Sequence, residues 1–312
     1  MMAPYLLLGF LISGVLSVLL PVRWVKAHLS RPGKRSVLKS ALFGVPLPLC
    51  SCGVIPVAAW MRRHGASKGA VGAFLLSTPQ TGVDGFLVAM GLLGLGMAVY
   101  NMAAAFVSGI IVGLVLNVFH DRPVAVTEPE EEAAGRKPWP LRVIRHGFVT
   151  IAGDIAVPLA FGIVASGVIS GLVDPDQFSA YGSGVWAKLA VIAIATPLYV
   201  CDIASLPVAA SMLAAGLSPG TVVVFLIAGP ATNAATYMTI GKILGKKEMF
   251  AYLACAVLLS MAMGFLLDFL APLLPPIEAA CLHGEAVSFW QILAALGLTV
   301  VLVNGKYQRS RS

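Results

Sequence analysis

The stretch Pro46-Leu47-Pro48-Leu49-Cys50-Ser51-Cys52-Gly53-Val54-Ile55-Pro56 places two cysteines, one residue apart, between prolines inside a long apolar run. Prolines lack a backbone N–H and restrict the residue before them, so we expect no regular helix to run through this stretch. Inside a membrane, an interrupted backbone persists only where protein or a water-filled cavity satisfies its polar groups. A break that carries two thiols therefore indicates a site.

The same stretch recurs 151 residues later as Pro197-Leu198-Tyr199-Val200-Cys201-Asp202-Ile203-Ala204-Ser205-Leu206-Pro207. The two copies align without a gap, and 16 of the 36 positions from 46 to 81 are identical in the second copy. Such self-similarity at one fixed offset indicates an internal repeat. The chain is therefore predicted to consist of two related halves, each built around a broken element.

Composition indicates a polytopic membrane protein. The chain is 58% hydrophobic and 11% charged, with a mean hydropathy of +0.90, whereas a soluble domain is about 25% charged. Five cysteines in 312 residues do not make a disulfide framework. Residues 1–20 are apolar without a basic beginning or a small-residue cleavage site, so we interpret them as a retained first span rather than a signal peptide.

The basic residues predict the topology, because cytoplasmic loops are enriched in lysine and arginine. Of the 21 basic residues, all but Lys188 lie at 22–40, 62–68, 119–146, 242–247 or in the C-terminal tail. If these regions share one side, segment 41–61 starts and ends there and must be a re-entrant hairpin. Segment 188–212 then enters from the opposite side. The alternative is that 41–61 crosses the membrane fully and Arg62 and Arg63 lie outside. The net charge of +7 thus reflects topology and does not indicate nucleic-acid binding.

The predicted fold class is an all-α polytopic membrane protein. It would have two inverted repeats, each with a re-entrant, proline-broken helical hairpin, and a substrate site where the repeats meet. Residues 1–118 form the first transmembrane repeat and residues 119–146 a cytoplasmic linker. Residues 147–312 form the second repeat with an extra C-terminal span, and the C-terminus is expected to be cytoplasmic.

The candidate site combines the two breaks with two further interruptions, at residues 77–84 and 229–233. Its predicted substrate-binding residues are Cys50, Cys52, Cys201, Thr78, Gln80, Thr81, Thr232 and Asn233. Thiolates select soft ions such as Cu(I), or zinc, and metalloids with them. The alternative is that these cysteines only fill space, as free cysteines often do. Recurrence of a cysteine at the same break favours a binding role, whereas Cys255 lies in a plain span and is expected to be a packing residue.

Three carboxylates are predicted at membrane depth. Intramembrane acids usually face the bundle interior and often relay protons or bind cations. Asp84 and Asp202 adjoin the interruptions and are the preferred candidates for proton coupling, and Asp154 is the third.

The quoted motifs resemble a known family. Residues 46–56 and 77–84, together with Pro197–Cys201 and Ala228–Asn233, are similar to the bacterial ArsP-type permeases, which include organoarsenical efflux permeases. The C-x-C form most resembles the branch described as copper and zinc efflux transporters. The resemblance covers nearly the whole chain and implies a multi-pass exporter of the prokaryotic inner membrane.

The leading functional hypothesis is a secondary transporter that exports a soft metal ion, copper or zinc. A trivalent organoarsenical or metalloid is the alternative substrate. A membrane thiol oxidoreductase fits less well because that chemistry normally uses C-x-x-C, and a channel also stays open. We expect no enzyme activity and no cofactor, and the expected partners are the lipid bilayer and the transported ion. The sequence has no nucleotide-binding P-loop, so the predicted driving force is a proton gradient or a partner protein.

Overall fold

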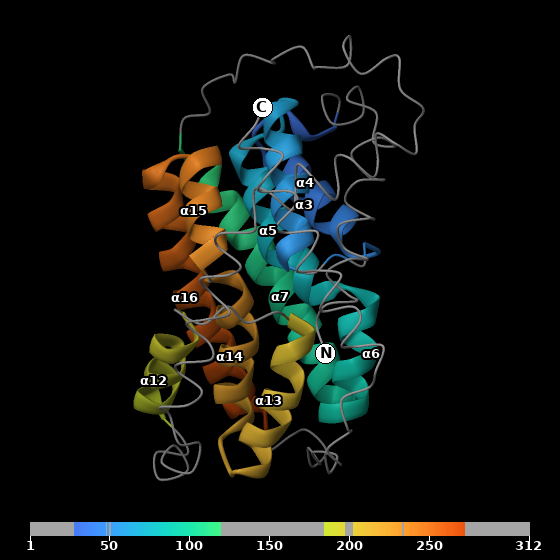
Figure 1. Cartoon of the computed structure of the whole chain (residues 1–312), viewed down its shortest axis with the longest axis vertical. Helices are drawn as coiled ribbons and strands as arrows, with labels where there is room; N and C mark the ends of the chain where they lie inside the picture. Colours follow the sequence, from blue (N-terminus) through green and yellow to red (C-terminus); the bar gives the residue numbers. More distant parts are fainter. Residues whose placement is uncertain are drawn as a thin grey trace, which may run out of the picture.

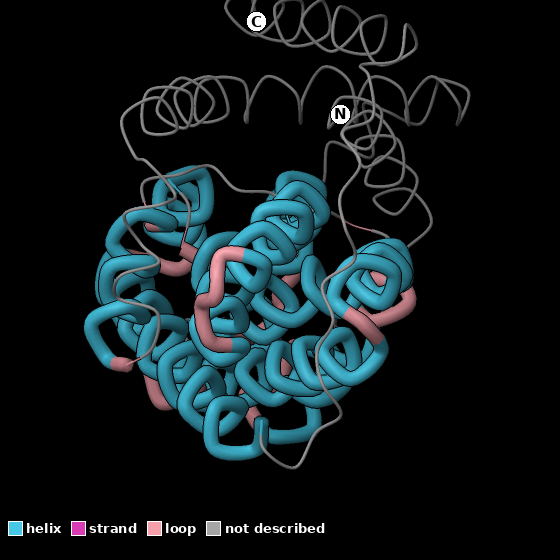
Figure 2. The backbone as a smooth tube through the Cα atoms, turned by 90° about the horizontal axis from the view of Figure 1, so that it is seen from below, coloured by secondary structure: helices cyan, strands magenta, loops and turns pink. Residues whose placement is uncertain are grey.

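The structure is a computed structural model, and it describes residues 28–47, 49, 51–119, 184–196, 202–232 and 234–271. Within these residues all regular structure is helical and there is no strand, which confirms the all-α prediction. Seen end-on in Figure 2, the described helices pack side by side as a bundle. The predicted first span at residues 1–20, nearly all of the linker and the extra C-terminal span lie outside the described residues.

Two sets of helices succeed one another along the chain with the same spacing. The first set is α3 (Lys34–Gly44), α4 (Ser51–Arg63), α5 (Lys68–Thr81), α6 (Val83–Leu93) and α7 (Leu95–Leu116). The second set is α12 (Val185–Ala195), α13 (Asp202–Ala214), α14 (Pro219–Ala231), α15 (Ala234–Ile243) and α16 (Lys246–Leu270). Every helix of the second set begins 151 residues after its counterpart. The repeat therefore extends well beyond the 36 positions where sequence identity first reveals it.

The turn between the second and third helix of each set has the same local chemistry. Gly65 and Gly216 adopt φ values of 92° and 89°, a conformation that glycine tolerates without a steric penalty. In both turns the residue after this glycine donates its N–H to a carbonyl five residues back, which closes the preceding helix. Ser67 and Ser218 then cap the next helix by accepting the N–H of Ala70 and Thr221, respectively.

The proline-rich stretch is broken over a shorter range than we expected. Helix α3 ends at Gly44 and α4 begins at Ser51, so the break is confirmed between them. Helix α4 nevertheless runs through Pro56, which corrects the expectation for the second part of the stretch. Pro56 cannot donate to the carbonyl of residue 52, and the helix loses that single hydrogen bond without ending. Likewise, α3 begins at Lys34, inside the stretch we interpreted as a basic loop.

The two sets of helices exchange contacts. Helix α6 packs against α13 of the other set, and α15 packs against α4, while α5 with α7 and α14 with α16 form the closest pairs. In Figure 1, α3, α4 and α15 occupy one end of the bundle and α12, α13 and α6 the other. The counterparts α3 and α12, α4 and α13, and α6 and α15 thus lie toward opposite ends of the bundle.

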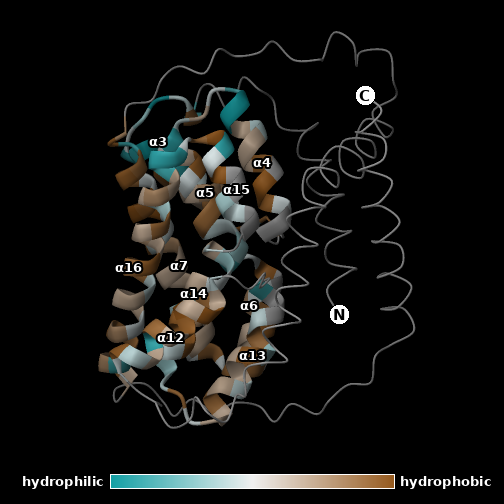
Figure 3. Ribbon diagram, turned by 60° about the vertical axis from the view of Figure 1, so that its left-hand side comes forward, coloured by the Kyte–Doolittle hydropathy of each residue, from teal (hydrophilic) through white to brown (hydrophobic). Residues whose placement is uncertain are grey.

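The end that holds α3 is also the basic end. Lys68 Nζ lies 2.6 Å from Glu248 Oε1, which joins the start of α5 to the start of α16. The predicted basic clusters at 62–68 and 242–247 therefore lie at the same end. Figure 3 shows hydrophilic residues gathered at this end, while most of the remaining length of the helices is apolar.

Two of the described helices, α7 and α16, are long and apolar enough to cross a membrane, with mean hydropathies of 2.1 and 2.2. At 1.5 Å per residue, their 22 and 25 residues exceed the roughly 30 Å of a hydrocarbon core. Helix α16 exposes Phe250, Leu258 and Phe269 along its outer side. A lipid environment accounts for large apolar side chains on the outside of such a helix.

Candidate functional site

The candidate polar residues that the structure describes are all buried. Thr78, Gln80 and Thr81 occupy the last turn of α5, Thr232 follows the last residue of α14, and Asp202 is the first residue of α13. Other predicted residues cannot be placed. Cys50, Cys201, Asn233 and Asp154 lie outside the described residues, and Cys52 and Asp84 lie in α4 and α6 with side chains that are not described.

Thr81 and Thr232 occupy equivalent positions and make equivalent hydrogen bonds. The Thr81 hydroxyl donates to the Ser77 carbonyl at 3.0 Å, and the Thr232 hydroxyl donates to the Ala228 carbonyl at 2.6 Å. Each is a bond from a threonine hydroxyl to the carbonyl four residues back in its own helix, and the Ala228 carbonyl also accepts the Thr232 backbone N–H at 2.9 Å. These two hydroxyl protons are therefore committed to the helix ends, and only the oxygen lone pairs remain available to a ligand.

Gln80 joins the two sets of helices. Its Nε2 donates to the carbonyl oxygen of Ile227 on α14, at 3.0 Å, across 147 residues of sequence. Because the amide nitrogen is engaged there, the orientation of the side-chain amide is set. The other end of the amide, Oε1, is buried and has no hydrogen-bond partner within the described part of the chain.

Asp202 is held against the start of α6. A Cβ atom built on Gly85 would lie 2.7 Å from Asp202 Oδ2, so only a glycine accommodates the carboxylate here without displacement. Asp202 begins α13 and Gly85 is the third residue of α6, so the carboxylate lies where these two helices begin. The Ser205 hydroxyl also donates to the Asp202 backbone carbonyl.

A second close approach involves Thr78. A methyl group on Gly44, the last residue of α3, would overlap the Thr78 hydroxyl oxygen. That oxygen is buried and is another polar atom without a hydrogen-bond partner among the residues described. Together, the contacts of Gln80, Asp202 and Thr78 bring the ends of α3, α5, α6, α13 and α14 into one region.

Tyr237 is a residue of this region that the sequence reasoning missed. Its hydroxyl lies within hydrogen-bonding reach of the side chains of Thr196, at the end of α12, and Thr232. It follows the interruption at 229–233 by about one helical turn, and its counterpart in the first set is the aromatic Phe86. That recurrence of an aromatic residue after each interruption was the available signal.

The structure leaves the thiol site as a prediction. Among the side chains it describes, no three histidine, cysteine or acidic residues gather closely enough to hold a metal ion. All three thiols of the predicted site, those of Cys50, Cys52 and Cys201, belong to residues whose side chains are not described. Cys255 is a free cysteine that packs against the apolar core of the bundle, in agreement with the packing role expected for it.

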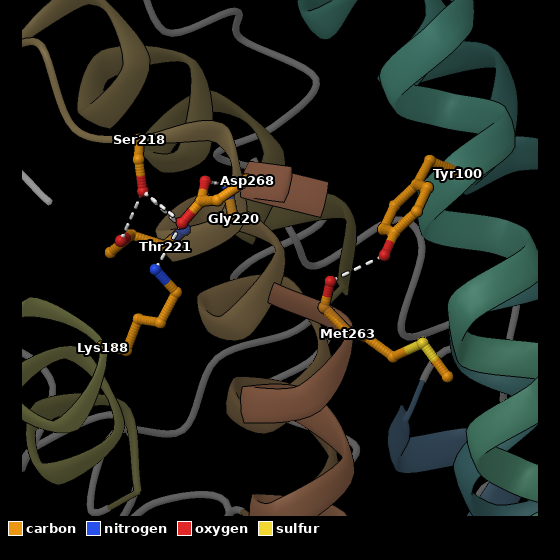
Figure 4. A network of polar contacts seen from close by, with 7 residues as sticks. All are labelled: Tyr100, Lys188, Ser218, Gly220, Thr221, Met263 and Asp268. Atoms are coloured by element: carbon orange, nitrogen blue, oxygen red, sulfur yellow. Dashed lines mark hydrogen bonds and ion pairs between the residues drawn. The ribbon is translucent and has the colours of Figure 1, made fainter. Parts of the chain in front are cut away.

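A separate polar network joins α12, α14 and α16 (Figure 4), and α12 lies at the opposite end of the bundle from α3 (Figure 1). Lys188 of α12 is fully buried and pairs with Asp268 of α16 at 2.5 Å. The Asp268 carboxylate also accepts the Gly220 N–H at 2.7 Å and the Ser218 hydroxyl at 3.1 Å, at the start of α14. This pairing explains why Lys188 stands apart from the basic clusters of the sequence.

Long apolar helices, helix breaks that recur in two halves and buried polar groups at those breaks are features of helical membrane transport proteins. A comparison with protein families identifies the family of transport proteins. Residues 1–269 match the ArsP_1 family, described as a predicted permease. The chain therefore belongs to this family of membrane permeases.

Individual relatives agree with this assignment. The UPF0718 protein MJ0584 of Methanocaldococcus jannaschii is 22% identical over 84% of this chain and 90% of its own length. The UPF0718 protein YraQ of Escherichia coli is 26% identical over 78% of this chain and 70% of its own length. The UPF0718 protein YcgR of Bacillus subtilis is 30% identical over a shorter region, 24% of this chain and 26% of its own. No solved structure matches the chain significantly.

Proposed function

We propose that this permease is a secondary efflux transporter that exports a soft heavy-metal ion, copper or zinc, through a thiol-lined site near the middle of the membrane. The observation that carries the proposal is the meeting of the helix breaks. Gln80 bonds to Ile227, and Asp202 lies against Gly85, so the broken ends of both halves share one buried region. Transporters built from repeats bind their substrates where such broken helices meet.

The architecture we propose is a pair of inverted repeats with re-entrant hairpins. Its support is the constant offset of 151 residues between counterpart helices and their position toward opposite ends of the bundle (Figure 1). The basic clusters at one end agree with a cytoplasmic face under the positive-inside rule. On this basis we propose an inner-membrane location with the C-terminus on the cytoplasmic side.

The proposed substrate class follows from the cysteines. Cys50 immediately precedes α4, Cys52 belongs to its first turn, and Cys201 immediately precedes α13. Three thiolates suit Cu(I) or zinc, and a trivalent arsenical is the alternative because it also binds thiolates. The family's description as a permease favours transport over the thiol oxidoreductase alternative.

The test compares serine variants of the cysteines in a strain that depends on the transporter for metal resistance. Cys50→Ser, Cys52→Ser and Cys201→Ser are each expected to abolish export while the protein inserts at normal levels, because removing one of three thiolates removes most of the affinity for a soft ion. Cys255→Ser is the matched control and is expected to transport normally. The measurement is cellular copper, zinc and arsenic content per inserted molecule. Wild-type export by the triple serine variant would contradict the thiol site.

A second measurement separates transport from redox chemistry. In a transporter, the thiols stay reduced during turnover, and the substrate ion protects them from alkylation by a maleimide. In an oxidoreductase, they cycle through a disulfide, and their alkylation depends on the redox buffer instead.

A further inference from the structure

The end of α5 presents a buried oxygen that lacks a protein partner. The Gln80 amide is held by its nitrogen on the Ile227 carbonyl, so Oε1 points away from that carbonyl. Gln80 is 4% exposed, and Oε1 has no hydrogen-bond donor in the part of the chain that the structure describes. A buried amide oxygen without a partner carries a desolvation cost, which a bound donor or cation would remove.

One close approach and the lengths of two helices place the Asp202 carboxylate in the same region. First, Asp202 touches Gly85, which follows Gln80 by only five residues across the break at Gly82. Second, α13 and α14 form a hairpin around Gly216 and contain the same number of residues, 13 each. The start of α13 is therefore expected to lie level with the end of α14, and Ile227, whose carbonyl holds Gln80, is about one helical turn before that end.

Two backbone carbonyl oxygens near the ends of α5 and α14 lack their regular N–H donors. Pro79 and Pro230 lie inside the last turns of α5 and α14 and have no N–H to donate to the carbonyls of Leu75 and Leu226. Both helices also point the negative ends of their dipoles at the break. Carboxylate, amide and backbone carbonyl oxygens, gathered where helices end, are the ligands of hard cations rather than of soft metals.

We propose that Gln80 and Asp202 belong to a Na⁺ site that couples the transporter to a sodium gradient. This inference rests on the proposed function, because it names the ion that drives export of the metal. The site is chemically distinct from the thiol site: oxygen atoms take the hard driving ion, and sulfur atoms take the soft cargo. Unwound carbonyls and the C-terminal ends of half-helices serve the same purpose in other sodium-coupled transporters.

The test measures Na⁺ binding without any metal cargo. The purified full-length protein in detergent is heated in NaCl or in choline chloride, at equal ionic strength and constant pH, and the apparent Kd for Na⁺ is obtained from the shift in Tm. We expect Na⁺ to raise the Tm of the wild-type protein. Gln80→Leu and Asp202→Asn should each raise the apparent Kd about tenfold or more, as the loss of a metal-site group typically does.

A pair of glycine variants keeps the test informative if those variants fold poorly. Gly85→Ala leaves both oxygen ligands in the sequence but displaces the Asp202 carboxylate, so it should also weaken Na⁺ binding. Gly91→Ala lies on the same helix, with open space where the methyl group would be, and should bind Na⁺ like the wild type.

The outcomes separate this inference from the proposed function. Equal Tm values in NaCl and choline chloride would overturn the sodium site, as would unchanged Na⁺ affinity in Asp202→Asn. Metal export in proteoliposomes driven by a pH gradient alone, without any Na⁺, would identify the driving ion as the proton and also overturn it. If Na⁺ binds as expected while the triple serine variant still exports metal, the sodium site stands and the thiol site fails.

Discussion

Asp268→Asn is expected to destabilise the protein far more than Lys188→Met, although both changes break the same ion pair. Lys188 is fully buried, whereas the Asp268 side chain is 26% exposed. Removing the carboxylate leaves a buried cation without its counter-ion, which costs about 3–5 kcal/mol. Removing the lysine leaves a carboxylate that still accepts the Gly220 N–H and the Ser218 hydroxyl, so we expect a loss of about 1–2 kcal/mol.

The double variant is expected to be more stable than Asp268→Asn alone. The reason is that neutral residues can pack at these positions. The first set of helices carries the neutral residues Val37 and Asn117 at the positions equivalent to Lys188 and Asp268. The assay is reversible unfolding in mixed micelles, followed by the fluorescence of the five tryptophans, of which Trp186 lies two residues before Lys188. Strict additivity of the two single changes would refute the direct interaction. A larger loss in Lys188→Met than in Asp268→Asn would refute the argument from burial.

Two further predictions address packing and topology. Gly44→Ala should destabilise the protein by about 1–3 kcal/mol in the same unfolding assay, because the added methyl group overlaps the Thr78 hydroxyl. Gly96→Ala, on a helix with open space at that point, is the control and should be neutral or slightly stabilising. Arg63 is the last residue of α4, and Ala215 follows the last residue of α13. In a cysteine-free background, Arg63→Cys and Ala215→Cys should be labelled by an impermeant maleimide from opposite faces of the membrane. Labelling of both from one face would contradict the inverted arrangement.

The two halves keep the same residue at some equivalent positions and differ at others. Both turns keep a glycine at the left-handed position and a serine at the cap, since these requirements are set by local backbone geometry. In contrast, the ion pair of the second half has no counterpart in the first. Well-packed neutral residues can replace a buried ion pair without loss of stability. The ion pair is therefore not required at the equivalent positions of the first half.

Local chemistry made the helical architecture predictable from the sequence. The composition and the apolar runs indicated membrane helices, and the prolines at 46 and 48 predicted the break before α4. The recurrence of the proline and cysteine stretch 151 residues later identified the two related halves. Each of these features depends on a few consecutive residues, so it is encoded without reference to the rest of the chain. The passage of α4 through Pro56 was missed because a helix can tolerate one lost hydrogen bond when the flanking turns are well packed.

Only the tertiary structure determines which residues contact one another at the candidate site. Gln80 was predicted to bind substrate, but only the fold pairs its nitrogen with Ile227 and leaves its oxygen unpartnered. The sequence placed Asp202 beside a break, and only packing brings it against Gly85 of the other half. Such contacts join residues more than a hundred positions apart. They depend on how whole helices pack, and no pattern along the chain records which helix faces which.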